Sequence, residues 1–104
     1  MSVGDTHDSG DAPRVVNNEA EQRYEVHVDG KLAGQADYHA QPGVITFPHT
    51  EVDPAYQGQG LAGMLAKTAL DDARQQGLRV VPLCSFFATY IRRHPEYADL
   101  VMES

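Results

Sequence analysis

A chain of 104 residues can enclose one hydrophobic core, so any binding site must lie on or between the elements of one small domain. Its formal net charge is −7, and residues 57–104 carry five basic and five acidic side chains, which places the excess negative charge before residue 57. A chain without a basic face is not expected to bind nucleic acid, and only the C-terminal half suits an anionic cofactor, whereas an amine or a basic peptide suits the other half. The chain has no apolar run that approaches the roughly 18 residues needed to cross a bilayer, and it has no signal-peptide pattern, so we expect a cytoplasmic protein without membrane contact. We also expect a monomer.

The first half of the chain predicts a tail followed by an antiparallel meander. Residues 1–14 consist mainly of Gly, Ser, Asp, Pro and His, which predicts a disordered tail ahead of a single domain over residues 15–104. Alternating apolar residues predict a strand over residues 23–28, and Asp29-Gly30 predicts the tight turn of a hairpin that returns over residues 31–40. A second turn at Pro42-Gly43 precedes a β-branched and aromatic run, which predicts a strand over residues 44–52.

The second half predicts helix, strand, helix. Apolar residues at helical spacing predict a helix from Gly60 to Gln76, and Gly77 is suited to end it. Residues 79–83 predict a short strand rich in valine. Residues 86–93 predict a second helix, which ends at His94 because the residue before a proline is pushed out of the helical region.

A glycine-rich segment, Gln57-Gly58-Gln59-Gly60-Leu61-Ala62, joins the last strand of the meander to the first helix. A strand, loop and helix in this order direct backbone N–H groups and the positive end of the helix dipole at one point, where a phosphate can bind without a basic side chain. Glycine at positions 58 and 60 lets the backbone approach the anion closely, and Gly63 lets the helix pack close to the sheet.

Two other phosphate-binding motifs do not fit these glycines. Residues 58–63 match the G-x-G-x-x-G dinucleotide fingerprint, but repeated βαβ units are missing and Arg79 and Val80 stand where an acidic residue is needed about 20 positions on. A P-loop is excluded because no Gly-Lys-Ser/Thr follows. The remaining alternative is that the glycines only make a tight turn.

Three blocks of sequence resemble the GNAT superfamily of N-acetyltransferases. The family signature Gln/Arg-x-x-Gly-x-Gly/Ala, at the turn from the fourth strand into a helix, is present as residues 57–62. The blocks His49-Thr50-Glu51-Val52 and Pro82-Leu83-Cys84-Ser85, the latter continuing through Tyr90-Ile91-Arg92-Arg93-His94-Pro95-Glu96-Tyr97, resemble the small GNAT-like proteins of roughly 100 residues that contain little more than the acetyl-CoA-binding core. The resemblance covers about residues 15–101.

The resemblance implies a mixed α/β (α+β) fold with two helices in the C-terminal half. Its mostly antiparallel sheet is splayed between the fourth and fifth strands, residues 44–52 and 79–83, and the pantetheine arm of coenzyme A lies in the opening. The implied activity is transfer of acetyl from acetyl-CoA to a primary amine of a small molecule or protein. The chain lacks the helices between the first two strands that help larger members to shape the acceptor site. Two alternatives follow, a module that binds or senses acyl-CoA without turnover and an interaction domain that has lost the ligand.

Transfer of an acyl group from a thioester to an amine needs a base for the amine, donors for the developing oxyanion and a proton for the departing thiolate. Strand alternation places His49 and Glu51 on one face, as candidate bases, and Thr50 and Val52 on the other. Backbone N–H groups near Val52 are the candidate oxyanion donors. The alternative for His49 is an ordinary polar residue at a strand end.

Cys84, the single cysteine, is the candidate nucleophile. It lies where a strand gives way to a helix, whose N-terminus favours a thiolate. In the proteins that this chain resembles, a cysteine here is thought to face the cofactor thiol, and the alternative role is a small apolar side chain that lines the pantetheine channel. By the same resemblance Tyr90 is the candidate acid for the leaving thiolate, although a helical tyrosine is more often a core residue.

The remaining candidates concern the cofactor. Phe86 and Phe87 are expected in the core or in the cofactor wall, and Arg92 and Arg93 either reach a phosphate or interact with the helix end. No metal is expected, because the histidines show no metal-ligand spacing. The expected cofactor-binding residues are Thr50, Val52, Gln57, Gly58, Gln59, Gly60, Leu61, Ala62, Cys84, Phe86, Phe87, Tyr90 and Arg93.

Overall fold

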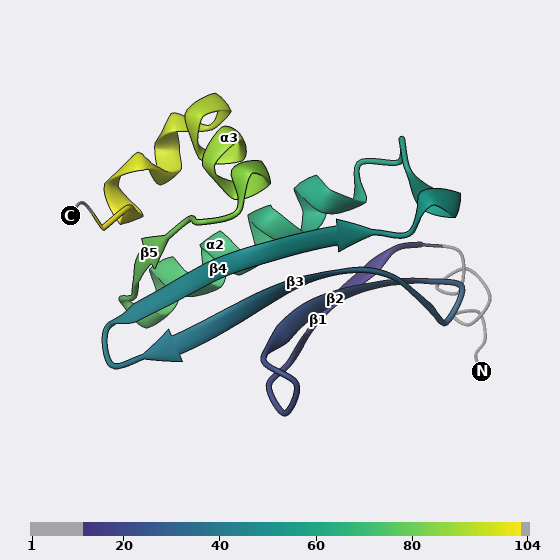
Figure 1. Ribbon diagram of the computed structural model, residues 1–104, viewed down its shortest axis with the longest axis horizontal. Coiled ribbons are helices and arrows are strands. Elements are labelled where there is room, and N and C mark those ends of the chain that lie inside the picture. Colours follow the sequence, from purple (N-terminus) through teal and green to yellow (C-terminus); the bar gives the residue numbers. More distant parts are fainter. Residues whose placement is uncertain (1–11, 103–104) are drawn as a thin grey trace, which may run out of the picture.

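The computed structural model describes residues 12–102, and five strands form one sheet in the order β1-β2-β3-β4-β5 (Figure 1). The strands are β1 (Arg14–Asn18), β2 (Arg23–Val28), β3 (Lys31–Gln41), β4 (Val44–Val52) and β5 (Arg79–Val81). The first four strands pair in antiparallel fashion, and β5 runs parallel to β4. The helices are η1 (Pro54–Tyr56), α2 (Leu61–Gln76), α3 (Ser85–Arg93) and η2 (Pro95–Leu100), of which η1 and η2 are 3-10 helices. This is the mixed α/β fold with a mostly antiparallel sheet that the sequence predicted.

β1 is a strand that the sequence pattern did not predict. Its two apolar residues, Val15 and Val16, are adjacent rather than alternating, so the segment carries no period-two signal. It pairs along its whole length with β2 and forms one edge of the sheet. Most of the predicted tail, residues 1–11, lies outside the described part of the chain, and Arg14 is already the first residue of β1.

The predicted turn and cap residues adopt the backbone conformations that those roles need. Asp29 and Gly30 have φ angles of 53° and 78°, as a two-residue hairpin turn with two positive φ angles requires. Gly77 ends α2 with a φ of 71°, and its N–H bonds to carbonyls of the last helical turn. The hairpin and the C-terminus of α2 are therefore confirmed.

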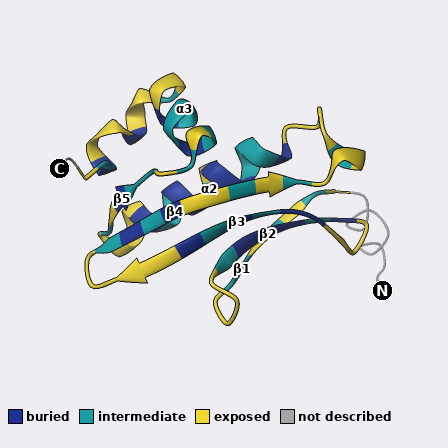
Figure 2. Ribbon diagram, in the orientation of Figure 1, coloured by how far each residue is buried: buried dark blue, intermediate teal, exposed yellow. Residues whose placement is uncertain are grey.

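The helices cover one face of the sheet, and the core lies between these two layers (Figures 1 and 2). α2 buries six side chains against the sheet, namely Leu61, Leu65, Ala66, Ala69, Leu70 and Ala73. α3 packs on the same face, where Phe87 stacks on Phe47 of β4 with ring centroids 4.3 Å apart. No element of residues 12–102 covers the opposite face. None of the helices in this range is long and apolar enough to cross a membrane.

The sheet opens between β4 and β5. β5 pairs only with residues 44–46 of β4, and the last backbone hydrogen bond across the gap is donated by the Cys84 N–H to the Phe47 carbonyl at 2.9 Å. β5 is two residues shorter than predicted because Pro82 has no N–H and the Leu83 N–H turns back to the Val81 carbonyl. Within the described chain, the rest of β4 therefore has no strand partner on this side.

A β-bulge in β4 sets which side chains face the helices. Asp37 of β3 pairs with His49 and His39 pairs with Thr46, so β4 contains one residue more than β3 between these pairs. The extra residue reverses the alternation after Phe47. Residues 45 and 47 face the helices before the bulge, whereas Thr50 and Val52 face them after it.

Candidate functional site

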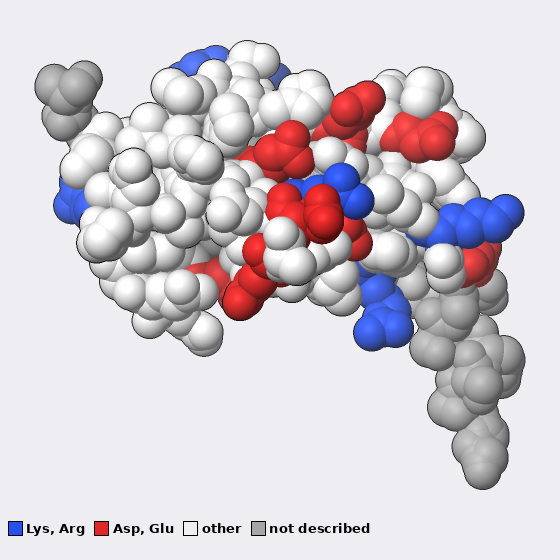
Figure 3. Space-filling view, turned by 60° about the horizontal axis from the view of Figure 1, so that its bottom comes forward, with Lys and Arg blue, Asp and Glu red and all other residues white. Residues whose placement is uncertain are grey.

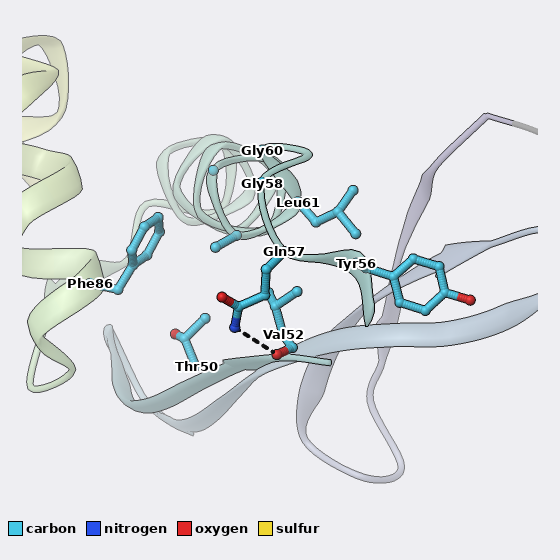
Figure 4. A pocket seen from close by; sticks show the side chains of 10 residues that line it. Thr50, Val52, Tyr56, Gln57, Gly58, Gly60, Leu61 and Phe86 are labelled. Carbon is cyan, nitrogen blue, oxygen red and sulfur yellow. Dashed lines mark hydrogen bonds between the residues drawn. The ribbon is translucent and has the colours of Figure 1, made fainter. Parts of the chain in front are cut away.

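A cavity of ≈ 460 Å³ lies where β4 ends and α2 begins (Figure 4). It is bounded by the end of β4, by the loop between η1 and α2, and by the start of α3. Its lining residues are Thr50, Val52, Tyr56, Gln57, Gly58, Gly60, Leu61, Ala62, Gly63 and Phe86. None of these side chains is charged, so any charge selectivity must come from the backbone.

The glycine loop has a backbone that other residues adopt at a cost. Gly58 and Gly60 have φ angles of 86° and 76°, in the left-handed region that favours glycine. A Cβ at either position would meet no protein atom within 4 Å, so it would project into open space. At these two positions the loop thus presents backbone and no side chain to the cavity, and its close approach to an anion stays a prediction.

The start of α2 fits an anion. Gly60 caps the 16-residue helix without any side-chain hydrogen bond to the first turn, whose N–H groups have no partner within the helix. No acidic residue stands in that turn, and Leu61, Ala62 and Gly63 line the cavity. The free N–H groups and the positive end of the helix dipole therefore meet at one wall, and a diphosphate matches that wall.

Gln57 connects this loop to β4. Its Nε2 donates to the Val52 carbonyl at 3.4 Å, drawn as the dashed line in Figure 4. The side chains of Thr50 and Val52 point into the same cavity from β4. The cavity therefore extends from the glycine loop along β4 toward the opening of the sheet.

Cys84 lies at the end of this path. Its thiol donates to Thr50 Oγ1 at 3.3 Å, across the gap between β4 and α3. Cys84 is half-buried and caps the N-terminus of α3. The structure therefore brings the one cysteine of the chain within hydrogen-bonding distance of a cavity-lining residue.

The two adjacent phenylalanines of α3 have different surroundings. Phe86 lines the cavity, whereas Phe87 is fully buried in the core against Phe47. Of the two roles open for Phe87, the structure places it in the core, where it supports the wall without lining it. Phe87 does not line the cavity, so the cavity does not support its predicted contact with the cofactor.

Tyr90 lies beside the cavity rather than in its wall. Its ring stacks on His94 with centroids 3.9 Å apart, and a Cβ at Gly63 would lie 3.8 Å from its Cε2. Burial raises the pKa of Tyr90, which keeps the phenol protonated and suits a proton donor. The exposed Gln59 and Arg93 do not line the cavity, so their contacts with a cofactor remain predictions.

His49 and Glu51 point to the other face of the sheet. His49 Nε2 lies 3.1 Å from Glu51 Oε1, and both side chains are exposed. Acidic side chains gather across the middle of the sheet side of the molecule, with fewer basic ones between them (Figure 3). The role of His49 and Glu51 as bases for an acceptor amine stays a prediction.

Two lining residues were not among the predicted site residues. Tyr56 belongs to η1, which Asp53 begins by accepting a hydrogen bond from the Ala55 N–H at 2.9 Å. An Asp-Pro pair signals such a turn but not the direction of the aromatic ring that follows. Gly63 was predicted only as a packing glycine, and it lines the cavity as well. Among the described residues, no group of His, Cys, Asp or Glu is arranged to hold a metal ion.

Comparisons with known proteins give the same family as the sequence motifs. Residues 23–100 match a family model described as GCN5-related N-acetyl-transferase. Protein NATD1 of Xenopus tropicalis is 27% identical over 96 residues, which cover 90% of this chain and 88% of that protein. Protein NATD1 of Homo sapiens is 36% identical over 52 residues, 50% of this chain and 46% of that protein. The matched segment thus spans about half the length of the human relative, and the same holds for those of mouse, chicken and cattle.

Solved structures show the same fold at low sequence identity. A GCN5-like protein from Staphylococcus aureus has a TM-score of 0.67 at 20% identity, covering 88% of this chain and 89% of that chain. The ribosomal-protein-S18-alanine N-acetyltransferase of Escherichia coli has a TM-score of 0.56 at 23% identity, covering 78% of this chain and 49% of that chain. The matched part is thus about half of the second protein.

Proposed function

Because the chain belongs to the family of GCN5-related N-acetyltransferases, we propose that it moves an acetyl group from acetyl-CoA to a primary amine of a small molecule or protein. The observation that carries the proposal is the cavity between β4 and α2, which runs from the start of α2 at Gly60 to Thr50, the residue that accepts a hydrogen bond from the Cys84 thiol. The thioester supplies the activated acetyl group. The expected monomeric state and cytoplasmic location belong to the same proposal.

The cavity suggests how the cosubstrate lies. The diphosphate binds the N–H groups at the start of α2, since no charged side chain lines the cavity and the helix dipole favours a negative charge there. The pantetheine arm then follows the unpaired edge of β4, past Val52 and Thr50. The free backbone N–H groups of this edge are the candidate donors to its amides and to the oxyanion.

Two routes of transfer fit this position. In the covalent route, the Cys84 thiolate attacks the thioester carbonyl, a new S–C bond forms at Cys84, and coenzyme A leaves as a thiol after taking a proton. The amine then attacks the acetylated Cys84 and restores the free thiol. In the direct route, the amine attacks the thioester itself, and Cys84 only lines the channel.

Proton transfers are assigned to groups on both sides of the opening. The His49–Glu51 pair accepts the proton of the amine from the uncovered face, directly or through water. Tyr90, which burial keeps protonated, is the proposed donor to the departing thiolate. Tyr90 is close to the cavity wall, since its Cε2 lies 3.8 Å from where a Cβ on Gly63 would stand.

The second candidate function is binding of acyl-CoA without turnover. The observation that favours it is the turn between β1 and β2, only four residues long, where larger relatives carry helices that shape the acceptor site. If the protein only binds acyl-CoA, the cavity holds the cosubstrate and no acceptor amine binds at the uncovered face of the sheet.

The test separates binding, covalent transfer and turnover. Calorimetric titration with acetyl-CoA measures binding, and the absence of both heat and thermal stabilisation would refute a cosubstrate site. Intact mass after incubation measures covalent transfer, and the covalent route predicts one added acetyl group that is lost in Cys84→Ala. A screen of amines and peptides for release of free coenzyme A thiol measures turnover. Binding without release for any amine would establish the second candidate instead.

A further inference from the structure

A second cavity of ≈ 310 Å³ lies at the far end of α2, away from the glycine loop. Buried residues of β2, β3, β4 and α2 form its floor, and polar residues of the β1–β2 turn and the end of α2 form its rim. None of the residues placed in the acetyl-CoA cavity contributes to it. It is therefore a separate pocket.

The floor of this second cavity is aromatic and has no free hydrogen-bond donor on its tyrosines. The rings of Tyr24 and Tyr38 lie with centroids 5.5 Å apart. The Tyr24 hydroxyl donates to Asp72 Oδ2 at 2.9 Å, and the Tyr38 hydroxyl donates to Asn17 Oδ1 at 2.8 Å. Both hydroxyls are therefore used within the protein, and the floor offers an apolar surface to a ligand.

The charge of the second cavity is negative. Glu19 is the one ionised side chain in its lining, and no Lys, Arg or His contributes to it. Burial is the main cause that raises the pKa of both Tyr24 and Tyr38, and the Glu19 carboxylate adds a smaller rise to each. The last residue of α2, Gln76, also lines the cavity, and a helix C-terminus adds negative potential.

We propose that the second cavity binds a small organic cation, an ammonium group carried on an apolar body. The apolar body packs on the tyrosine floor, and the ammonium lies at the rim beside Glu19. This ligand is not the acetyl acceptor, because the two cavities lie at opposite ends of the 16-residue helix, about 24 Å apart at 1.5 Å per residue. The site is thus a binding function additional to acetyl transfer.

Three probe molecules of similar size test the charge requirement. The 15N–1H spectrum of the protein is recorded with phenethylammonium, with 2-phenylethanol and with phenylacetate. We expect phenethylammonium to bind with a dissociation constant on the order of 1 mM and to shift the amide signals of Gln22 and Leu78, while those of Gly58 and Gly60 stay in place. The neutral and anionic probes should bind at least about fivefold more weakly. Equal binding of all three, or shifts confined to the glycine loop, would overturn the proposal.

Two variants and a matched control locate the site. Glu19→Gln should weaken phenethylammonium about fivefold, whereas Glu21→Gln, which removes the same charge from the same turn but does not line the cavity, should leave its affinity unchanged. Ala40→Phe, at an exposed lining position of β3, should fill the pocket and abolish the shifts. Acetyl-CoA titrations of each variant show whether the first cavity is intact, so failure of this proposal is distinguishable from failure of the proposed function. Equal weakening by both glutamate variants would show that only bulk charge matters and would refute the site.

Discussion

Substitution of Gly60 by Asn and by Asp separates the shape of the anion-binding wall from its charge. Both side chains tolerate a positive φ better than most and are nearly equal in size, so they share the steric cost at a φ of 76°. A Cβ there meets no protein atom within 4 Å, so both variants should fold. Only Asp places a negative charge where the diphosphate is proposed to bind.

The expected difference between the two variants is large. One charge pair at 4–8 Å in an effective dielectric near 20 repels by about 2–4 kcal/mol, which corresponds to roughly 30- to 1,000-fold in the dissociation constant of acetyl-CoA. Calorimetry on both variants measures it, with melting temperatures as the control for folding. The ratio should shrink as salt is raised, because ions screen the repulsion. If Asp and Asn bound acetyl-CoA equally well, the diphosphate would not lie at the start of α2.

Three further predictions concern stability. Glu25 is buried on the outer sheet face, where hydrogen bonds from His27, Arg23 and Asn18 lower its pKa to about 2 from the usual 4.5. Because the pKa is lower in the folded state, the stabilisation is complete above pH 4.5 and is lost as the pH falls toward 2. Glu25→Gln should therefore lower the free energy of unfolding by about 1–3 kcal/mol at pH 7 and leave it unchanged near pH 2, as measured by urea unfolding. A loss of stability that does not depend on pH would contradict this. Phe87→Ala removes a fully buried ring stacked in the core and should lower the free energy of unfolding by about 3–5 kcal/mol. A fall in melting temperature of less than a few degrees would show that this ring does not pack as described. Gly34→Ala places a Cβ 2.9 Å from the Glu51 carbonyl oxygen and should lower stability by about 1–3 kcal/mol, whereas an unchanged melting temperature would mean that β3 and β4 can separate at no cost.

Features that depend on one or two residues could be predicted from the sequence. The hairpin turn needs only Asp29 and Gly30 in positive φ, and the end of α2 needs only Gly77. β1 was missed because its pairing comes from β2 and not from a pattern of its own. η2 was missed as well, since a short 3-10 helix after Pro95 leaves no periodic signal.

In the candidate site too, local features could be predicted from the sequence and features that depend on tertiary packing could not. The glycine loop could be predicted because it acts through its backbone, which glycine spacing reports directly. Adjacent helical residues point about 100° apart, so the sequence could not tell which of Phe86 and Phe87 lines the cavity and which supports the core. Tyr56 reaches the cavity only through the geometry of η1, which Asp53 sets. The contact of Cys84 with Thr50 depends on how far β5 follows β4, a tertiary feature.

The extra residue in β4 makes this strand more sensitive to length than to composition. A strand of the same length without the bulge would place every later side chain on the other face. The histidine and glutamate would then turn toward the helices, and the threonine that contacts the thiol would turn toward solvent. Against a relative whose strand has no bulge, an alignment that does not open its gap at Pro48 would pair residues that lie on opposite faces, so the bulge must be placed before site residues are compared.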